Sequence, residues 1–365
     1  MCGIAGYIGI SKNNQLSFDL LSKIFEQNES RGIDASGYWG FSSSEQKVYT
    51  YKEPTRSSHF VQQSFWKTVG QIDFDIIITH ARGASQGYGD PSDNRNNHPF
   101  VSENNSIAVI HNGRIEEHEY AALKQKYKLE TDCDSEILLR LFECEIVDDP
   151  NYQNARIASL QKIFSSINHG HMAVAIGEFY EQTSNLWLFR NRHRPLWLVD
   201  LRETLGQIFF FSDPDLWINV LNTLGCDKKN FLGKQIFTQI NPEQIYHFCL
   251  LKDKSLIFDK FNVVRTSHFE PWIYSGELVK KLYDNRLNVE KIIKEDSFVK
   301  EDVAQDIQQL AVICKDLGIT GQKILDLVNQ KNAQNILSSY EIEEILISLK
   351  KQHNTLKILE TILSM

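Results

Sequence analysis

Up to residue 255, the chain alternates short apolar runs with clusters of Gly, Asn, Asp and Pro. Short runs rich in β-branched and aromatic residues indicate strands, whereas apolar residues three and four positions apart indicate amphipathic helices. Strands are predicted at 4–8, 75–79, 107–111, 172–177, 185–190, 196–199, 208–211, 244–250 and 255–258, and helices at 17–27, 115–126, 135–144 and 156–167. Many strands with a few helices in separate stretches predict an α+β fold rather than a doubly wound parallel sheet.

The pattern changes near residue 272, where Gly and Pro become rare and Leu, Ile, Lys and Glu dominate. Apolar residues at helical spacing predict amphipathic helices at 303–317, 322–330, 338–352 and 355–363. We therefore expect a first domain at 1–262, a linker at 263–275 and a helical C-terminal domain at 276–365. The apolar stripes of these helices favour the core of that domain over a surface for a partner.

Composition narrows the class of protein. A chain of 365 residues can bury one large core and a smaller one, and a net charge of −8 argues against nucleic acid as a partner. Six cysteines, without a CxxC pair or zinc-like spacing, predict a reduced cytoplasmic chain without disulfides. No apolar run is long enough to cross a membrane, and the N-terminus lacks the basic region of a signal peptide, so we expect neither a membrane partner nor secretion.

Cys2 directly follows the initiator methionine and begins the apolar run Cys2-Gly3-Ile4-Ala5-Gly6. Removal of Met1 would leave a terminal residue that carries a thiol and a free α-amine together. An α-amine titrates at about 7.7–8.0 and a thiol at about 8.5, so one residue could supply a nucleophile and a general base near neutral pH. A retained Met1 would block that amine.

Polar residues at the ends of predicted strands supply the other parts of an amide-hydrolysing site. Asn112 can donate to an oxyanion through its side-chain amide, and Gly113 through an uncrowded backbone N–H. Arg82 can clamp a carboxylate, while Asp134, a plausible N-cap of the next helix, can bind an ammonium group. A carboxylate, an ammonium group and a side-chain amide together describe free glutamine.

These segments occur in one order along the chain. They are Cys-Gly-Ile-Ala-Gly at 2–6, Arg-Gly-x-Asp-x-x-Gly at 31–37, His-x-Arg at 80–82, Asn-x-His-Pro at 96–99, His-Asn-Gly-x-Ile at 111–115, Asp-Ser-Glu at 134–136, Pro-Leu at 195–196 and Phe-Ser-Asp at 211–213. In this order they resemble the class II glutamine amidotransferases, the N-terminal nucleophile family that includes glucosamine-6-phosphate synthase, amidophosphoribosyltransferase and asparagine synthetase. The resemblance covers residues 2–255.

The resemblance implies a four-layer αββα fold, no cofactor, and a role for each matching residue. Cys2 would form a γ-glutamyl thioester, and Asn112 and Gly113 would form the oxyanion hole. Arg82 would bind the α-carboxylate of L-glutamine and Asp134 its α-ammonium group. The remaining positions are Ser85 and His98, which would line the pocket, and Arg31 and Gly32, which would pack beside the new amino terminus.

Two departures from the family pattern matter. The family often has His-Thr-Arg followed by an aromatic residue, whereas this chain has Ala81 and Gly83, which predicts weaker glutamine binding or a different contact over the pocket. Nothing after residue 270 resembles an ammonia-accepting domain, so we expect the acceptor to be a separate synthase or synthetase chain.

Alternative functions remain. The open position at Gly83 is compatible with a stand-alone amidase for another γ-glutamyl-type amide, and the missing acceptor domain is compatible with a non-catalytic module that senses glutamine or scaffolds a complex. His80, His98 and His111 could suggest a metal site, but they lack neighbouring Cys or carboxylate ligands at metal spacing, so no metal is expected. Cys133 is expected to be structural.

Overall fold

A computed structural model describes residues 2–85, 87–143, 152–167, 170–191, 194–225, 237–242, 244–263, 273–275 and 336–338. The chain divides into two compact units, Met1–His268 and Phe269–Met365. In the second unit the described residues are strands β14 (Ile273–Ser275) and β15 (Ile336–Ser338), which pair in antiparallel fashion. Strand β14 lies in the predicted linker, and β15 ends where a helix was predicted to begin. The rest of the predicted helical domain lies outside the described residues.

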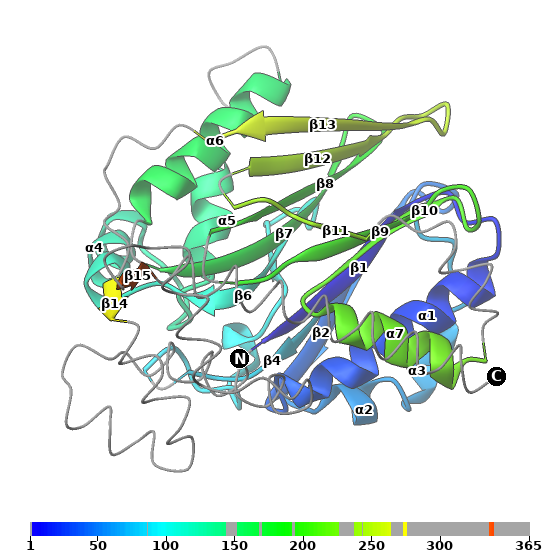
Figure 1. Ribbon diagram of the computed structural model, residues 1–365, viewed down its shortest axis with the longest axis horizontal. Coiled ribbons are helices and arrows are strands. Elements are labelled where there is room, and N and C mark those ends of the chain that lie inside the picture. The colour runs from blue at the N-terminus through cyan, green and yellow to red at the C-terminus, as the bar shows by residue number, and fades with distance from the viewer. Residues whose placement is uncertain are drawn as a thin grey trace. The chain divides into compact units, whose positions relative to one another are not determined.

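The first unit contains two antiparallel sheets (Figure 1). The seven-stranded sheet has the order β11-β9-β10-β1-β4-β2-β3, with β1 at its centre. Its strands are β1 (Gly3–Gly9), β2 (Ala35–Ser42), β3 (Lys47–Glu53), β4 (Ile76–Arg82), β9 (Trp197–Leu201), β10 (Gln207–Phe211) and β11 (Phe237–Gln239).

The six-stranded sheet has the order β13-β12-β8-β7-β6-β5. Its strands are β5 (Phe100–Val101), β6 (Ile107–Arg114), β7 (His171–Tyr180), β8 (Thr183–Arg190), β12 (Gln244–Leu250) and β13 (Leu256–Asn262). Every pairing in both sheets is antiparallel, which is typical of α+β folds with helices on one face of each sheet.

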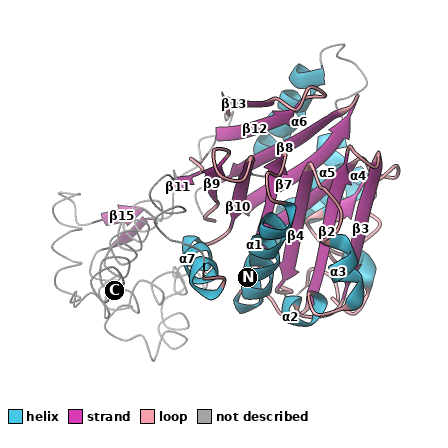
Figure 2. Ribbon diagram, turned by 90° about the vertical axis from the view of Figure 1, so that its right-hand side faces the viewer, coloured by secondary structure: helices cyan, strands magenta, loops and turns pink. Residues whose placement is uncertain are grey.

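Helices cover the outer face of each sheet (Figures 1 and 2). The seven-stranded sheet packs on α1 (Asn14–Gln27), α2 (Ser57–Phe60), α3 (Ser64–Val69) and α7 (Pro214–Thr223). The six-stranded sheet packs on α4 (Glu117–Tyr127), α5 (Glu136–Glu143) and α6 (Tyr152–Ser166). Two short 3-10 helices, η1 (Asn28–Ser30) and η2 (Asn94–Asn96), precede α4 in the chain.

Strand β1 contributes side chains to two of the hydrophobic cores. Ala5 and Tyr7 belong to the core beneath α1 and α7, while Ile4 and Ile8 belong to the core between the two sheets. Successive side chains of a strand point to opposite faces, and both faces of β1 are buried, so an uninterrupted apolar run is what this position requires. The predicted αββα order is confirmed for the first unit.

Strand β2 was missed by the sequence analysis, which recognised 31–37 only as a motif. Its small residues allow close packing, because a Cβ atom on Gly37 would lie 2.2 Å from the carbonyl oxygen of His98. Helix α7 was also missed, although Asp213 caps it and Pro214 begins it, which is a recognisable start signal. Strand β6 continues to Arg114, so α4 begins at Glu117 rather than at residue 115.

Candidate active site

Cys2 lies immediately before β1 and is 8% exposed. Gly3 pairs with Ala81 of β4, which places Cys2 beside the end of β4. The Cys2 Sγ is 3.6 Å from the carbonyl oxygen of Gly83. Burial raises the pKa of the Cys2 thiol above its usual value, and the nearby Arg82 guanidinium opposes that shift. The thiol therefore needs a base before it can act as a nucleophile.

The backbone at Cys2 is held from two sides. Arg31 Nε donates to the Cys2 carbonyl oxygen at 3.1 Å, and Arg31 Nη1 lies 3.4 Å from Asp213 Oδ2. The Ile4 N–H donates to Ser212 Oγ and the Ser212 N–H donates to the Ile4 carbonyl oxygen, both at 3.0 Å. Arg31 of the second motif therefore holds Cys2, and Ser212 of the last motif holds Ile4, two residues further along the chain.

Gly32 and Asp34 hold the end of β4. The Asp34 N–H donates to the Arg82 carbonyl oxygen at 2.9 Å, and Asp34 Oδ2 accepts from the Ala84 N–H at 2.7 Å. A Cβ atom on Gly32 would lie 2.3 Å from the carbonyl carbon of Arg82 and 2.4 Å from the nitrogen of Gly83. Only glycine fits there without a shift of the backbone that carries the Gly83 carbonyl to Cys2.

Arg82 is buried and held by polar atoms of one loop. Its Nη1 donates to Asn97 Oδ1 at 2.7 Å, and its Nη2 donates to the carbonyl oxygens of Tyr88 at 2.8 Å and Gly89 at 2.9 Å. Within the described part of the chain, no carboxylate forms an ion pair with Arg82. Since a guanidinium group has about five N–H donors, the Nε–H and one Nη1–H remain for an incoming anion.

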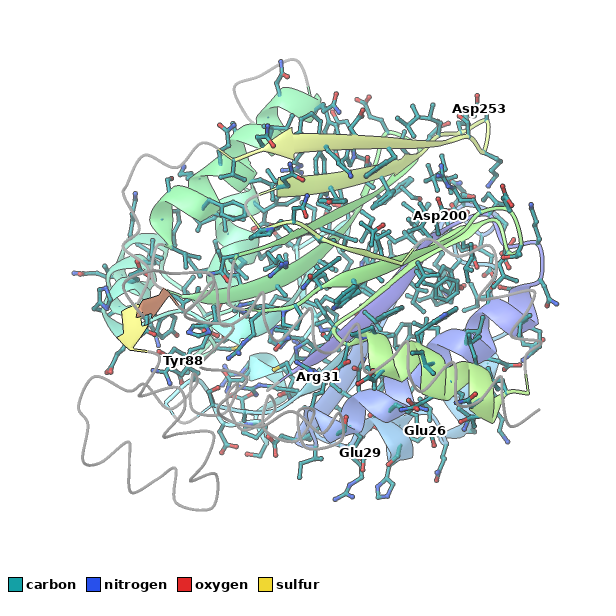
Figure 3. The ribbon with its side chains drawn as sticks, in the orientation of Figure 1. Glu26, Glu29, Arg31, Tyr88, Asp200 and Asp253 are labelled. Atoms are coloured by element: carbon teal, nitrogen blue, oxygen red, sulfur yellow. The ribbon has the colours of Figure 1, made fainter. Side chains whose placement is uncertain are left out.

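Figure 3 shows Arg31 and Tyr88 on either side of the start of β1 in that view. Their contacts explain this arrangement, because Arg31 bonds to Cys2 and the Tyr88 carbonyl bonds to Arg82. Arg31 thus marks the side of the candidate site that holds Cys2, and Tyr88 marks the side that holds Arg82.

Asn112 lies in β6 and is fully buried. Among the described residues, neither its Nδ2 nor its Oδ1 has a hydrogen-bond partner. An unsatisfied buried amide costs about 1–3 kcal/mol, so this side chain needs an explanation. A Cβ atom on the adjacent Gly113 would lie 1.8 Å from the carbonyl oxygen of His171, so this close approach requires glycine.

Asp134 is buried between the end of β6 and the start of α5. Its Oδ2 accepts from the Ile115 N–H at 2.7 Å, and its Oδ1 lies 3.2 Å from Ser135 Oγ. In the contacts of the described residues, the carboxylate does not cap the first turn of α5, which differs from the N-cap interpretation. It fixes the chain directly after Asn112 and Gly113 instead.

Three buried histidines connect the two sheets. The rings of His80 and His98 stack with centroids 3.9 Å apart, and His80 Nε2 bonds to the His111 carbonyl oxygen at 3.0 Å. Since a carbonyl oxygen only accepts, the proton of His80 lies on Nε2. Burial lowers the pKa of His80 to about 3, and it lowers the pKa values of His98 and His111, so all three are neutral at pH 7.

The ring of His111 is fully engaged, with Nε2 3.0 Å from the His171 carbonyl oxygen and Nδ1 2.9 Å from Ser135 Oγ. His98, by contrast, has no hydrogen-bond partner for either ring nitrogen among the described residues. No group of His, Cys, Asp or Glu that could hold a metal ion occurs in the part of the chain that the structure describes.

Ser85 is half-buried and lines a cavity of about 560 Å³. The other lining residues are Ala84, Gly87, Gly89, Asp90, Pro91, Tyr120, Lys124 and Asp132. The Gly89 carbonyl that bonds to Arg82 also borders this cavity. The cavity therefore adjoins both the loop that holds Arg82 and the segment that leads to Asp134.

The structure thus gathers the predicted residues from both sheets. Cys2, directly before β1, lies beside the end of β4, which carries Arg82, and the bond from His80 to His111 joins β4 to the strand that carries Asn112. Sequence reasoning missed the residues that hold this set in place. The side chains are Asp34, Lys52, Asn94, Asn97 and Ser212. Asp34, Asn94, Asn97 and Ser212 lie in or beside the recognised motifs, whereas no sequence signal marks Lys52.

Residues 90–215 match the family model of the glutamine amidotransferase domain. This match includes Asn112, Gly113 and Asp134, together with the Ser212-Asp213 pair that anchors β1. Residues 90–215 therefore belong to a glutamine amidotransferase domain. The predicted resemblance is confirmed for this segment, whereas the reaction of the chain and the roles of individual residues stay predictions.

Curated relatives agree with this assignment. The glutamine–fructose-6-phosphate aminotransferase of Chlorobaculum tepidum is 35% identical over 148 residues, which is 39% of this chain and 22% of the relative. The enzyme of the same name from Clostridium tetani is 26% identical over 331 residues, covering 86% of this chain and 49% of the relative. The chain therefore spans half or less of the length of these relatives.

A solved structure supports the fold. The glutamine phosphoribosylpyrophosphate amidotransferase from B. subtilis superposes with a TM-score of 0.50 at 16% identity, covering 87% of this chain and 65% of that chain. In the described residues, no helix is both long and apolar enough to cross a membrane.

Proposed function

We propose that the amidotransferase domain hydrolyses the side-chain amide of L-glutamine through Cys2, giving glutamate and ammonia. The observation that carries this proposal is the buried Asn112 amide, which has no partner among the described residues. Strand β6, which carries it, contacts both β1 and β4, beside which the Cys2 thiol lies. A preformed donor without an acceptor, beside a nucleophile, is what stabilisation of a tetrahedral oxyanion requires.

The reaction begins after removal of Met1. The free α-amine of Cys2 takes the thiol proton, and the thiolate attacks the side-chain amide carbon of glutamine. The resulting oxyanion accepts hydrogen bonds from Asn112 Nδ2 and the Gly113 N–H. The ammonium group of Cys2 returns its proton to the departing ammonia, and water then cleaves the thioester to release glutamate.

The other residues bind or position the substrate. Arg82 binds the α-carboxylate through its remaining N–H groups, and Asp134 binds the α-ammonium group. Ser85 and His98 line the pocket. Arg31 and Gly32 hold the backbone that presents Cys2 and the Gly83 carbonyl.

We propose that ammonia passes to an acceptor on a separate synthase or synthetase chain. The relatives carry names of enzymes that transfer an amino group to fructose-6-phosphate, and the part of their length that this chain does not match leaves room for that second activity. Co-purification from the native source would test this partnership: an acceptor enzyme that raises glutamine turnover supports it, and its absence from every active complex contradicts it.

The test of the proposal is release of ammonia and glutamate from L-glutamine by the purified protein, with intact mass showing loss of Met1. Cys2→Ala should reduce turnover to background, because the thiol that forms the thioester is lost. Cys133→Ala is the matched control, since Cys133 is also buried and its pKa is raised by burial to about 12. Turnover that survives in Cys2→Ala would refute the mechanism.

A second candidate function is hydrolysis of a larger γ-glutamyl-type amide. The absence of a side chain at Gly83 and the cavity of about 560 Å³ favour it. Kinetics with N-substituted γ-amides decide between the two substrates: good turnover of glutamine beside failure of every larger amide rejects the second candidate.

A further inference from the structure

Lys52 lies near the end of β3, the edge strand of the seven-stranded sheet, and its ammonium group contacts the segment that precedes β5. Its Nζ donates to the carbonyl oxygen of Asn97 at 2.5 Å and to that of Pro99 at 3.1 Å. The same Nζ lies 5.1 Å from the centre of the Phe100 ring. A half-buried lysine therefore fixes the backbone on both sides of His98.

Hydrogen bonds connect Lys52 to Arg82 through two asparagines. Asn97 Nδ2 donates to Asn94 Oδ1 at 3.1 Å, and Asn94 Nδ2 donates to the Lys52 carbonyl oxygen at 2.7 Å. Together with the bond from Lys52 Nζ to Asn97, these contacts form a closed ring. Asn97 Oδ1 then accepts from Arg82 Nη1 at 2.7 Å, so the ring determines where the guanidinium group lies.

Lys52 and Arg82 also form a pair of neighbouring cations. In the described part of the chain, neither takes part in an ion pair with a carboxylate. Burial lowers the pKa of Lys52 to about 8, and the positive charge of Arg82 acts in the same direction, although Asp93 and Glu136 oppose it from a distance. Partly buried cations without a counter-ion are costly, and an anion bound at the remaining N–H groups of Arg82 would remove much of that cost.

We propose that Lys52 is a positioning residue for the α-carboxylate of the substrate, acting through Asn97 and Arg82. It orients the guanidinium group by the hydrogen-bond ring and adds a second positive charge behind it. This inference rests on the proposed glutamine hydrolysis and explains how the same site selects a substrate that carries an α-carboxylate.

The first test compares Lys52→Met, which removes both the charge and the hydrogen bonds, with Lys52→Arg, which keeps the charge. Lys52→Met should raise the KM for L-glutamine about tenfold with kcat changed by less than about twofold, because weakening one charge-assisted contact affects ground state and transition state alike. Lys52→Arg should recover most of the loss. Lys47→Met, on the exposed part of the same strand, should leave both constants unchanged.

A second test separates carboxylate binding from general damage. The electrophile 6-diazo-5-oxo-L-norleucine carries an α-carboxylate, whereas iodoacetamide does not, and both label Cys2 measurably by mass. In Lys52→Met, half-saturation by the first reagent should rise about tenfold while the rate of labelling by the second stays the same. Equal slowing with both reagents, or no change with either, overturns the inference.

Calorimetry with L-glutamate measures carboxylate binding without any turnover. Binding about tenfold weaker in Lys52→Met than in the wild-type protein supports the role of Lys52 even where hydrolysis of glutamine fails. Equal affinity in both proteins, or no binding to the wild-type protein, overturns it. Loss of glutamine turnover in the wild-type protein refutes the proposed function separately.

Discussion

The two flanks of the candidate site differ in how completely their polar groups are bonded. At the start of β1, the Cys2 carbonyl, the Ile4 backbone and the Gly83 carbonyl all have partners. On β6, the Asn112 side chain is fully buried, yet both of its polar atoms lack a partner in the described residues. In the proposed mechanism, the first flank holds the nucleophile still, and the second keeps hydrogen-bond donors for an oxygen atom of the substrate.

This difference has an energetic meaning. A satisfied flank adds stability, whereas a buried unpaired amide lowers it by about 1–3 kcal/mol. Residues that are retained at a cost in stability are typical of functional sites. A mutation on the bonded flank should therefore lower stability, and activity should fall with it. Loss of the unpaired Asn112 amide should lower activity without lowering stability.

The largest expected effect comes from Asn112→Leu. Loss of an oxyanion donor should lower kcat about 10²–10³-fold, while the free energy of unfolding stays constant or rises because no unpaired amide is left buried. Stopped or coupled ammonia assays and urea denaturation measure the two quantities.

The matched control is Asn185→Leu, another buried asparagine. Its Oδ1 bonds to His247 Nε2 at 2.9 Å and its Nδ2 to Thr183 Oγ1 at 3.0 Å. We expect it to lower the free energy of unfolding by about 1–3 kcal/mol without changing kcat. Equal destabilisation by both leucine variants would break the comparison of the two flanks.

A smaller combined effect is expected from Gly32→Ala on the bonded flank. The new methyl group would collide with the backbone of Arg82 and Gly83, so stability should fall by about 1–3 kcal/mol and kcat/KM should fall with it. Thermal unfolding and ammonia release measure this change. Ile33→Ala, at the exposed neighbouring position, is the control, and an equal loss of stability there would argue against the steric explanation.

The last prediction concerns the buried histidines that join the two sheets, and it is a change of stability with pH. Burial lowers the pKa of His80 from 6.5 to about 3, so the unfolded chain binds a proton there that the folded chain does not. Stability is therefore complete above pH 6.5 and falls as the pH drops toward 3, by about 1.4 kcal/mol per pH unit for each such histidine.

Urea denaturation between pH 7 and pH 4.5 measures this slope. His80→Gln should make the slope shallower by about one proton. A slope that is the same in His80→Gln and in the wild-type protein would contradict the assignment of His80 as a buried neutral base.

Much of the fold followed from local patterns. The runs that form β1, β12 and β13 were predicted because strands with a buried face are rich in β-branched and aromatic residues. Strand β2 was not predicted, because Gly37 and its small neighbours are set by the approach of the His98 carbonyl from a distant segment. Close packing between segments far apart leaves no periodic signal.

The sequence by itself indicated the candidate chemistry of this protein, because Cys2, Arg82, the Asn112-Gly113 pair and Asp134 occur in the order of one family. Only the tertiary structure decided how these groups are held, because the hydrogen bonds from Asp34 to Ala84, from Arg31 to Cys2 and from Lys52 to Asn97 join residues that lie 29 to 50 positions apart. Such bonds depend on how strands and loops far apart in the chain come together, and a motif read along the chain carries no record of the partner across the fold.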